Sequence, residues 1–118
     1  PQCVRIVACH HPLTEMIGGP MTARVWGGQA AARDFAEARV DLVLSGHIHA
    51  PFTWPYSFGD GKTYAVGAGT LSIRERGGVP PGFNVVDIER AAIRIAALGW
   101  TGSHFEPYRT WSLDRRSR

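Results

Sequence analysis

At 118 residues the chain provides for one domain or less, because a core of this size buries only about two thirds of the unfolded chain's surface. A hydrophobic fraction of 44% and a charged fraction of 19% exclude a disordered or collagen-like protein. The tail from Asp114 to Arg118 supplies +2 of the formal net charge of +3, so we expect a solvated tail and no basic nucleic-acid-binding surface. No apolar stretch approaches the roughly 20 residues of a membrane span.

The two cysteines, Cys3 and Cys9, lie six residues apart in a run that we expect to be extended. At about 3.3 Å per residue, this separation places them roughly 20 Å apart. A disulfide requires Cα atoms within about 7 Å of each other, so the two thiols are not expected to pair. Free thiols favour a reduced, cytoplasmic location.

The first expected strand is the short β-branched run Val4 to Ala8, which is typical of a strand covered on both faces. It ends at His10-His11-Pro12, because proline cannot donate to a strand ladder. The Gly- and Pro-rich stretch 13–28 follows as a loop. Gln29 to Ala38 is then predicted to be a helix, with Ala31, Phe35 and Ala38 on its apolar stripe.

A second buried strand is expected at 41–44, followed by Ser45-Gly46 and then by His47-Ile48-His49. Two hairpins complete the regular structure. The first joins 52–57 to 62–66 through an Asp-Gly turn, and the second joins 83–88 to 92–97. After Trp100 the pattern predicts an irregular segment.

Four of the five histidines directly follow the two expected buried strands: His10, His11, His47 and His49. The carboxyl ends of parallel strands form ligand sites in open α/β sheets, so we expect these side chains to converge. Imidazole is a preferred ligand of first-row metals at neutral pH. An extended His-x-His segment would turn both rings to one face, and Gly46 would leave room for an ion near the backbone.

The segment Leu44-Ser45-Gly46-His47-Ile48-His49, coupled to the upstream His10-His11-Pro12, resembles the last two motifs of the calcineurin-like metallophosphoesterases. The resemblance spans residues 3 to 100. It implies a mixed α/β (α+β) fold, namely part of a sandwich of two β-sheets flanked by helices.

The resemblance also implies a dinuclear centre of two divalent or trivalent ions, which would be Fe, Mn or Zn. It assigns His10 and His47 to the second metal and His49 to the first. His11 has no fixed role in the family, so it remains a candidate for substrate binding through phosphate or for a hydrogen bond behind a ligand. His104 is interpreted as a surface residue.

The activity implied by the resemblance is the hydrolysis of phosphoric mono- or diesters, with a diester or nucleotide favoured and no nucleic-acid or membrane partner. The family's upstream Asp-x-His, Gly-Asp and Gly-Asn-His motifs, which complete the metal site, are expected to lie outside this chain. We therefore interpret residues 1–102 as the C-terminal half of a metallophosphoesterase domain and residues 103–118 as an irregular basic tail. The start at Pro1 fits a cut through a longer reading frame.

Other interpretations stay open. The chain could be a non-catalytic module that binds one zinc ion or an interaction partner, or a second chain could supply the absent carboxylates. Arg74 or Arg76, in a segment typical of a bacterial branch of the family, could contact a substrate anion or form surface salt bridges. The alternating aromatics Phe52, Trp54 and Tyr56 share one strand face, where they could stack on a nucleobase or pack into the core.

Overall fold

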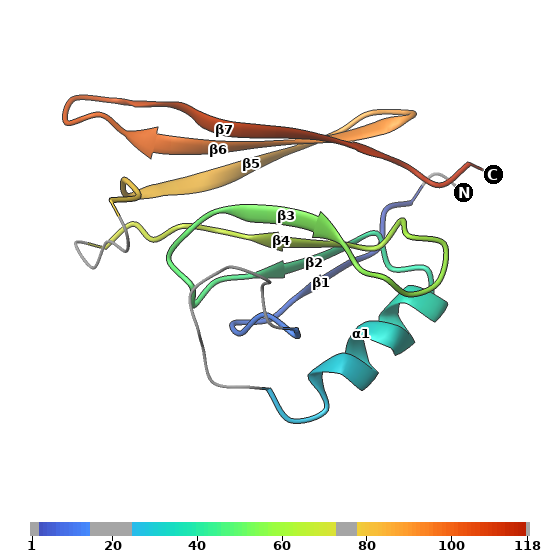
Figure 1. The fold of residues 1–118 in the computed structure, drawn as a ribbon. Coiled ribbons are helices and arrows are strands. Elements are labelled where there is room, and N and C mark those ends of the chain that lie inside the picture. Colours follow the sequence, from blue (N-terminus) through green and yellow to red (C-terminus); the bar gives the residue numbers. More distant parts are fainter. Residues whose placement is uncertain (1–2, 15–24, 73–77, 118) are drawn as a thin grey trace.

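A computed structural model describes residues 3–14, 25–72 and 78–117. These residues form three layers (Figure 1): a four-stranded sheet A in the middle, a three-stranded sheet B on one face of it, and helix α1 (Gly28–Glu37) on the other. Two sheets and a flanking helix confirm the mixed α/β class and the partial sandwich predicted from the sequence.

Sheet A has the strand order β1-β2-β4-β3 and is mainly parallel. Strand β2 pairs in parallel with both β1 and β4, whereas β3 runs antiparallel to β4. Three strands therefore end on the same side, which we name the carboxyl edge, and the opposite side is the amino edge. The strand bounds are β1 Ile6–Ala8, β2 Leu42–Ser45, β3 Phe52–Pro55 and β4 Tyr64–Gly67.

Sheet B is an antiparallel meander of β5 (Gly82–Ile88), β6 (Ala92–Trp100) and β7 (Phe105–Asp114). The pairing of β5 with β6 confirms the second predicted hairpin. Strand β7 pairs with β6 along its whole length, with a register shift between Ala97 and Leu98 that leaves Tyr108 as an extra residue on β7.

The prediction of an irregular segment after Trp100, and with it the irregular tail 103–118, is wrong for residues 105–114. Residues 105–110 are all exposed, so burial supplies no signal for this strand. Its stability comes from backbone hydrogen bonds to β6 and from the inward-facing Trp111 and Leu113, which pack against the neighbouring sheet.

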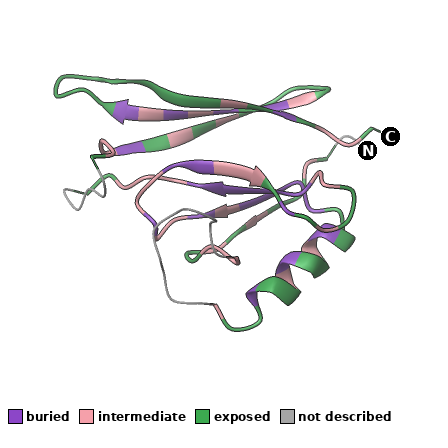
Figure 2. Ribbon diagram, in the orientation of Figure 1, coloured by how far each residue is buried: buried purple, intermediate pink, exposed green. Residues whose placement is uncertain are grey.

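Two hydrophobic clusters fill the spaces between the layers. Figure 2 shows where the buried residues lie along α1 and the strands. One cluster lies between α1 and sheet A and is built around Val43, Ile48 and Phe52. The other lies between the sheets, where side chains of β2 and β4 meet side chains of β6 and β7: Leu42, Tyr64, Val66, Ile93, Ile95 and Leu113.

Helix α1 buries mainly small residues, and Phe35 of the predicted stripe packs, partly buried, against the core cluster. Gly28, Ala32 and Ala36 face the sheet, whereas Ala38 lies beyond the helix and is exposed. A Cβ atom at Gly28 would overlap the carbonyl oxygen of Leu13. The helix backbone at Gly28 therefore lies too close to the segment after β1 for any side chain, and the other buried positions, Ala32 and Ala36, carry only small ones.

The β3–β4 hairpin confirms the first predicted hairpin. It also shows that the aromatic residues of this segment pack into the core. Phe52 and Tyr56 are 4% and 5% exposed, and Trp54 packs against the same cluster, so all three contribute to the core. A Cβ atom at Gly67 would overlap the ring of Phe52, which explains why the facing strand carries glycine there.

Strand β1 departs from the expected strand covered on both faces. It lies at the end of sheet A and pairs only with β2 among the described strands. Ile6 is 47% exposed, since neither sheet B nor α1 covers its face at this position. Only the opposite face of β1 is packed, through Val7.

Cys3 and Cys9 are not joined in a disulfide, in agreement with the sequence prediction. Within the described ranges, none of the helices combines the length and the apolar character that crossing a bilayer requires.

Candidate metal centre

The histidines that follow β1 and β2 meet at the carboxyl edge of sheet A. The backbone N–H of Cys9 donates to the carbonyl of Leu44, and the N–H of Gly46 donates to the carbonyl of His10, each over 2.9 Å. These two bonds continue the parallel pairing beyond the strand ends. They hold the segments that carry His10 and His47 side by side.

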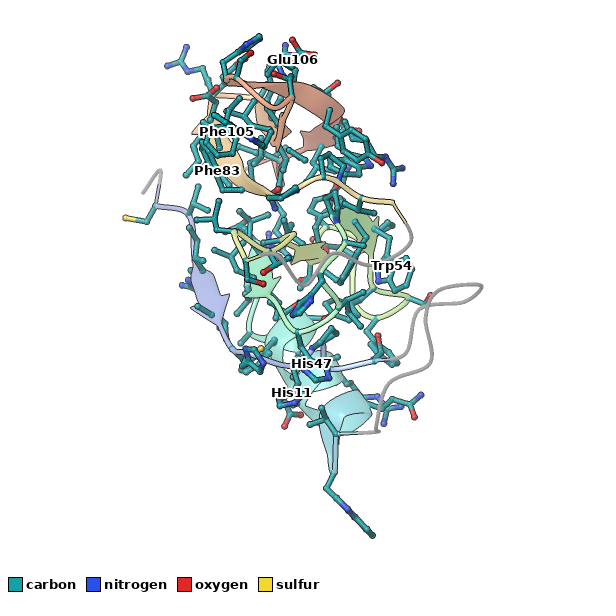
Figure 3. The ribbon with its side chains drawn as sticks, turned by 90° about the vertical axis from the view of Figure 1, so that its left-hand side faces the viewer. His11, His47, Trp54, Phe83, Phe105 and Glu106 are labelled. Carbon is teal, nitrogen blue, oxygen red and sulfur yellow. The ribbon has the colours of Figure 1, made fainter. Side chains whose placement is uncertain are left out.

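Three imidazoles converge there. The potential ligand nitrogens of His10, His11 and His47 lie within 4.8 Å of one another. The ring centroids of His11 and His47 are 4.2 Å apart. The ring centroid of His10 lies 4.8 Å from that of His11 and 5.3 Å from that of His47. Figure 3 shows His11 and His47 next to each other. His10 and His11 are exposed and His47 is half-buried, so solutes can reach the group.

His49 lies outside this group, although the sequence places it one residue beyond Ile48. The expectation of an extended His-x-His segment is wrong, because His47 and His49 have left-handed backbones with φ of 66° and 64°. Ile48 between them is 2% exposed and packs in the core beside α1. A buried Ile48 and a bond from its N–H to the Gly46 carbonyl, at 2.7 Å, hold this tightly turned conformation.

The donor set fits a single metal ion. Zinc bonds imidazole nitrogen at about 2.0–2.1 Å, which sets the ligand nitrogens of a tetrahedral site about 3.4 Å apart, so the three rings need only close slightly. A Cβ atom built at Gly46 would lie 3.9 Å from Nδ1 of His10, in ordinary van der Waals contact, so this position lies directly beside the group. The group contains no carboxylate, and neutral ligands alone do not offset the repulsion between two adjacent cations.

A Gly-Asp pair does occur in the chain, at Gly59-Asp60, contrary to the expectation that this upstream motif is absent. It lies in the β3–β4 turn at the amino edge, on the opposite side of sheet A from the histidines. The Asp60 carboxylate binds Arg116 over 2.7 Å, and this hydrogen bond lowers the pKa of Asp60. Asp60 therefore does not serve as a bridging ligand of the candidate centre.

Cys9 is a neighbour of the centre that the sequence reasoning did not single out. Its thiol contacts the backbone carbonyl of His11 at 3.3 Å and that of Leu44 at 3.8 Å. Burial raises the pKa of this thiol, so Cys9 stays protonated at neutral pH and supports the His11 backbone. Its position directly before His10 is the sequence feature that could have identified it.

Burial and the nearby Cys9 also raise the pKa of Tyr56 to about 12.

The remaining candidates lie elsewhere. His104 is exposed and pairs with Glu106 over 3.2 Å, as expected of a surface residue. Arg74 and Arg76 lie outside the described residues.

Comparison with known proteins shows a likeness in fold. No family model matches the sequence, and no curated protein matches it. Among solved structures, the chain is similar to an uncharacterized protein of Streptococcus pneumoniae described as a predicted phosphoesterase. The TM-score is 0.58 with 20% identity, over 76% of this chain and 49% of that one. A wild-type Vps29 of Entamoeba histolytica, complexed with zinc, gives a TM-score of 0.47 with 21% identity over 73% and 46% of the two chains.

The chain thus spans about half the length of the solved structures that it matches. At 20% identity, the streptococcal structure shows the fold alone. The fold is that of the calcineurin-like phosphoesterases, in part, which confirms the resemblance found in the sequence.

Proposed function

We propose that this chain is the C-terminal half of a metal-dependent phosphoesterase, and that the carboxyl edge of sheet A contributes histidine ligands to its centre. The observation that carries the proposal is the convergence of His10, His11 and His47, brought from two parallel strands to within 4.8 Å of one another. The resemblance of the Gly-His-x-His segment and the shared fold support the reaction class.

His10 and His47 are the ligands on which the resemblance and the observed geometry agree. The resemblance adds His49, whereas the geometry adds His11. When bound, the metal ions would polarise a phosphate ester and lower the pKa of water. The chain's own contribution is to hold imidazole nitrogens at an edge that is open to solvent, where His11 can alternatively donate a hydrogen bond to a substrate phosphate. A diester or nucleotide is the favoured substrate.

The proposed centre needs carboxylates that the described part of this edge does not supply. We place them in an N-terminal half that completes the domain. The lack of a disulfide between Cys3 and Cys9 supports a reduced, cytoplasmic setting, which stays a prediction.

A second candidate function is a non-catalytic module that binds one zinc ion. The absence of a carboxylate from the three-histidine group favours it, because three neutral imidazoles with an open fourth position suit one ion.

The metal content of the purified chain, measured by mass spectrometry after dialysis against zinc or manganese, tests the ligands. We expect His10→Ala and His47→Ala to weaken metal binding at least tenfold. His11→Ala should weaken metal binding more than His49→Ala does, because the His11 ring belongs to the observed group. A larger loss in His49→Ala would instead support the set that the resemblance implies, and His104→Ala is the matched surface control.

The activity test separates the two candidate functions. The chain alone should show no turnover of a chromogenic phosphodiester with added Mn or Zn. Adding a polypeptide that carries Asp-x-His and Gly-Asn-His motifs, encoded upstream in the same frame, should restore turnover that His47→Ala abolishes. Metal binding without restored turnover would favour the non-catalytic module, and turnover by the pure chain alone would overturn the half-domain interpretation.

A further inference from the structure

A second charged site lies at the amino edge of sheet A, at the opposite end of the strands from the histidines. A cavity of about 290 Å³ opens there between the segment before β1, the end of α1 and the segment after β7. Four guanidinium groups and one carboxylate contribute to its lining: Arg5, Arg39, Arg115, Arg116 and Asp41, with Cys3 and Ser117.

Arg116 forms a rigid wall of this cavity. Its side chain is only 7% exposed, and it binds Asp41 over 3.1 Å and Asp60 over 2.7 Å. It also donates to Oγ1 of Thr63 over 2.8 Å. A side chain held by this many bonds loses little further conformational freedom when a ligand binds.

Arginine side chains also donate hydrogen bonds to the carbonyl groups at the end of α1. The C-terminal end of a helix carries partial negative charge and ordinarily repels anions. Arg5 donates to the carbonyl of Ala38 over 2.7 Å. Arg116 donates to the carbonyls of Arg39 and Val40 over 3.0 and 3.2 Å. The negative end of the helix dipole is therefore covered by cations, which leaves the cavity attractive to negative charge.

The charges of the named groups are not balanced. The three guanidinium groups of Arg5, Arg39 and Arg116 stand against two carboxylates, Asp41 and Asp60, and Arg116 forms ion pairs with both. No carboxylate of the described residues lies within ion-pair distance of Arg5 or Arg39. Guanidinium groups match phosphate oxygens geometrically and can bind them through paired hydrogen bonds.

We infer that this cavity binds a phosphate group, either as a free ion or as part of a small phosphorylated molecule, through Arg5 and Arg39 against the fixed wall of Arg116. The site is separate from the proposed metal centre. It does not depend on the proposed function, because the histidines and these arginines lie at opposite edges of sheet A.

Isothermal titration of the chain with three probes tests the inference: inorganic phosphate, pyrophosphate and glycerol phosphate, each in the presence of EDTA. We expect Arg39→Gln and Arg5→Gln to weaken binding of the tightest probe at least tenfold. The matched control is Arg94→Gln, which removes the same charge from sheet B, where Arg94 is paired with Glu89 over 2.6 Å. It should leave the affinity within twofold.

Binding should also survive His47→Ala, which distinguishes this site from the metal centre. Tighter binding of the two inorganic ions would identify a free ion as the ligand, and tighter binding of glycerol phosphate would identify an ester. Equal weakening by Arg94→Gln and Arg39→Gln would overturn the inference, since it would show only a general charge effect. The lack of binding of all three probes at millimolar concentration would overturn it as well.

Discussion

The two edges of sheet A use charged and polar side chains in opposite ways. At the amino edge, Arg116 is buried and its guanidinium binds two carboxylates, a hydroxyl and two carbonyls. At the carboxyl edge, His10 and His11 are exposed, and His47 and His49 adopt a backbone that L-residues avoid. The donors of Arg116 are thus engaged by groups of the fold itself, whereas the carboxyl edge keeps imidazole nitrogens accessible to a metal. The difference predicts that mutations will separate stability from metal binding.

The largest expected effect is at the amino edge. Arg116→Ala leaves the buried Asp41 carboxylate without its cation, so we expect the free energy of unfolding to fall by about 3 kcal/mol. Urea denaturation followed by circular dichroism measures this loss. Arg94→Ala, at an exposed pair, should change stability by less than about 0.5 kcal/mol. Equal effects of the two substitutions would contradict the role of Arg116 as the link between the C-terminal segment and sheet A.

A smaller effect of the opposite sign is expected at the carboxyl edge. Left-handed backbone costs an L-residue about 1 kcal/mol relative to glycine. His47→Gly and His49→Gly should therefore each be about 1 kcal/mol more stable than the corresponding alanine variants, as measured in the same denaturation experiment. At His104, whose φ is not positive, the alanine variant should be at least as stable as the glycine variant. If glycine gave no advantage at positions 47 and 49, the strain assigned to this edge would be absent.

The smallest expected effect is on the loss of stability at acidic pH. Because the hydrogen bond from Arg116 lowers the pKa of Asp60 in the folded chain, its stabilising contribution is present above the carboxyl group's ordinary pKa near 3.8. It is lost as the pH falls through the lowered folded pKa. The side chain is 40% exposed, so solvent screening limits the effect. Asp60→Asn should flatten the decline of the urea midpoint between about pH 5 and pH 2. A decline equal to that of the unmodified chain would exclude Asp60 as a contributor.

Local signals in the sequence were sufficient for much of this fold. Asp60-Gly61 marks a turn whose two glycines, Gly59 and Gly61, do have positive φ, and both hairpins form as predicted. The histidines follow strands that pair in parallel, so their arrival at one edge was readable from strand order. These features depend on neighbours in the sequence or on the general rule for parallel sheets.

Features that depend on residues distant in the chain could not be predicted from the sequence. Arg116 looked like part of a solvated tail, but its partners Asp41 and Asp60 lie 75 and 56 residues away in the sequence. The turned backbone at His47 and His49 depends on where Ile48 finds space in the core. Strand β7 depends on the length of β6 rather than on its own pattern. In each case a tertiary contact, absent from any local window, decides the conformation.

Strand β7 also bears on how the chain behaves among copies of itself. It is a 10-residue strand at the end of sheet B, and a bare strand of this length invites intermolecular pairing and aggregation. Its first half carries deterrents, because Pro107 lacks an N–H, Tyr108 interrupts the ladder and Arg109 adds charge. The second half, from Thr110 to Asp114, has a regular ladder without proline or an interruption. Within this strand the final five residues are therefore the segment most open to pairing with another copy, and we expect an added lysine or proline there to oppose such pairing.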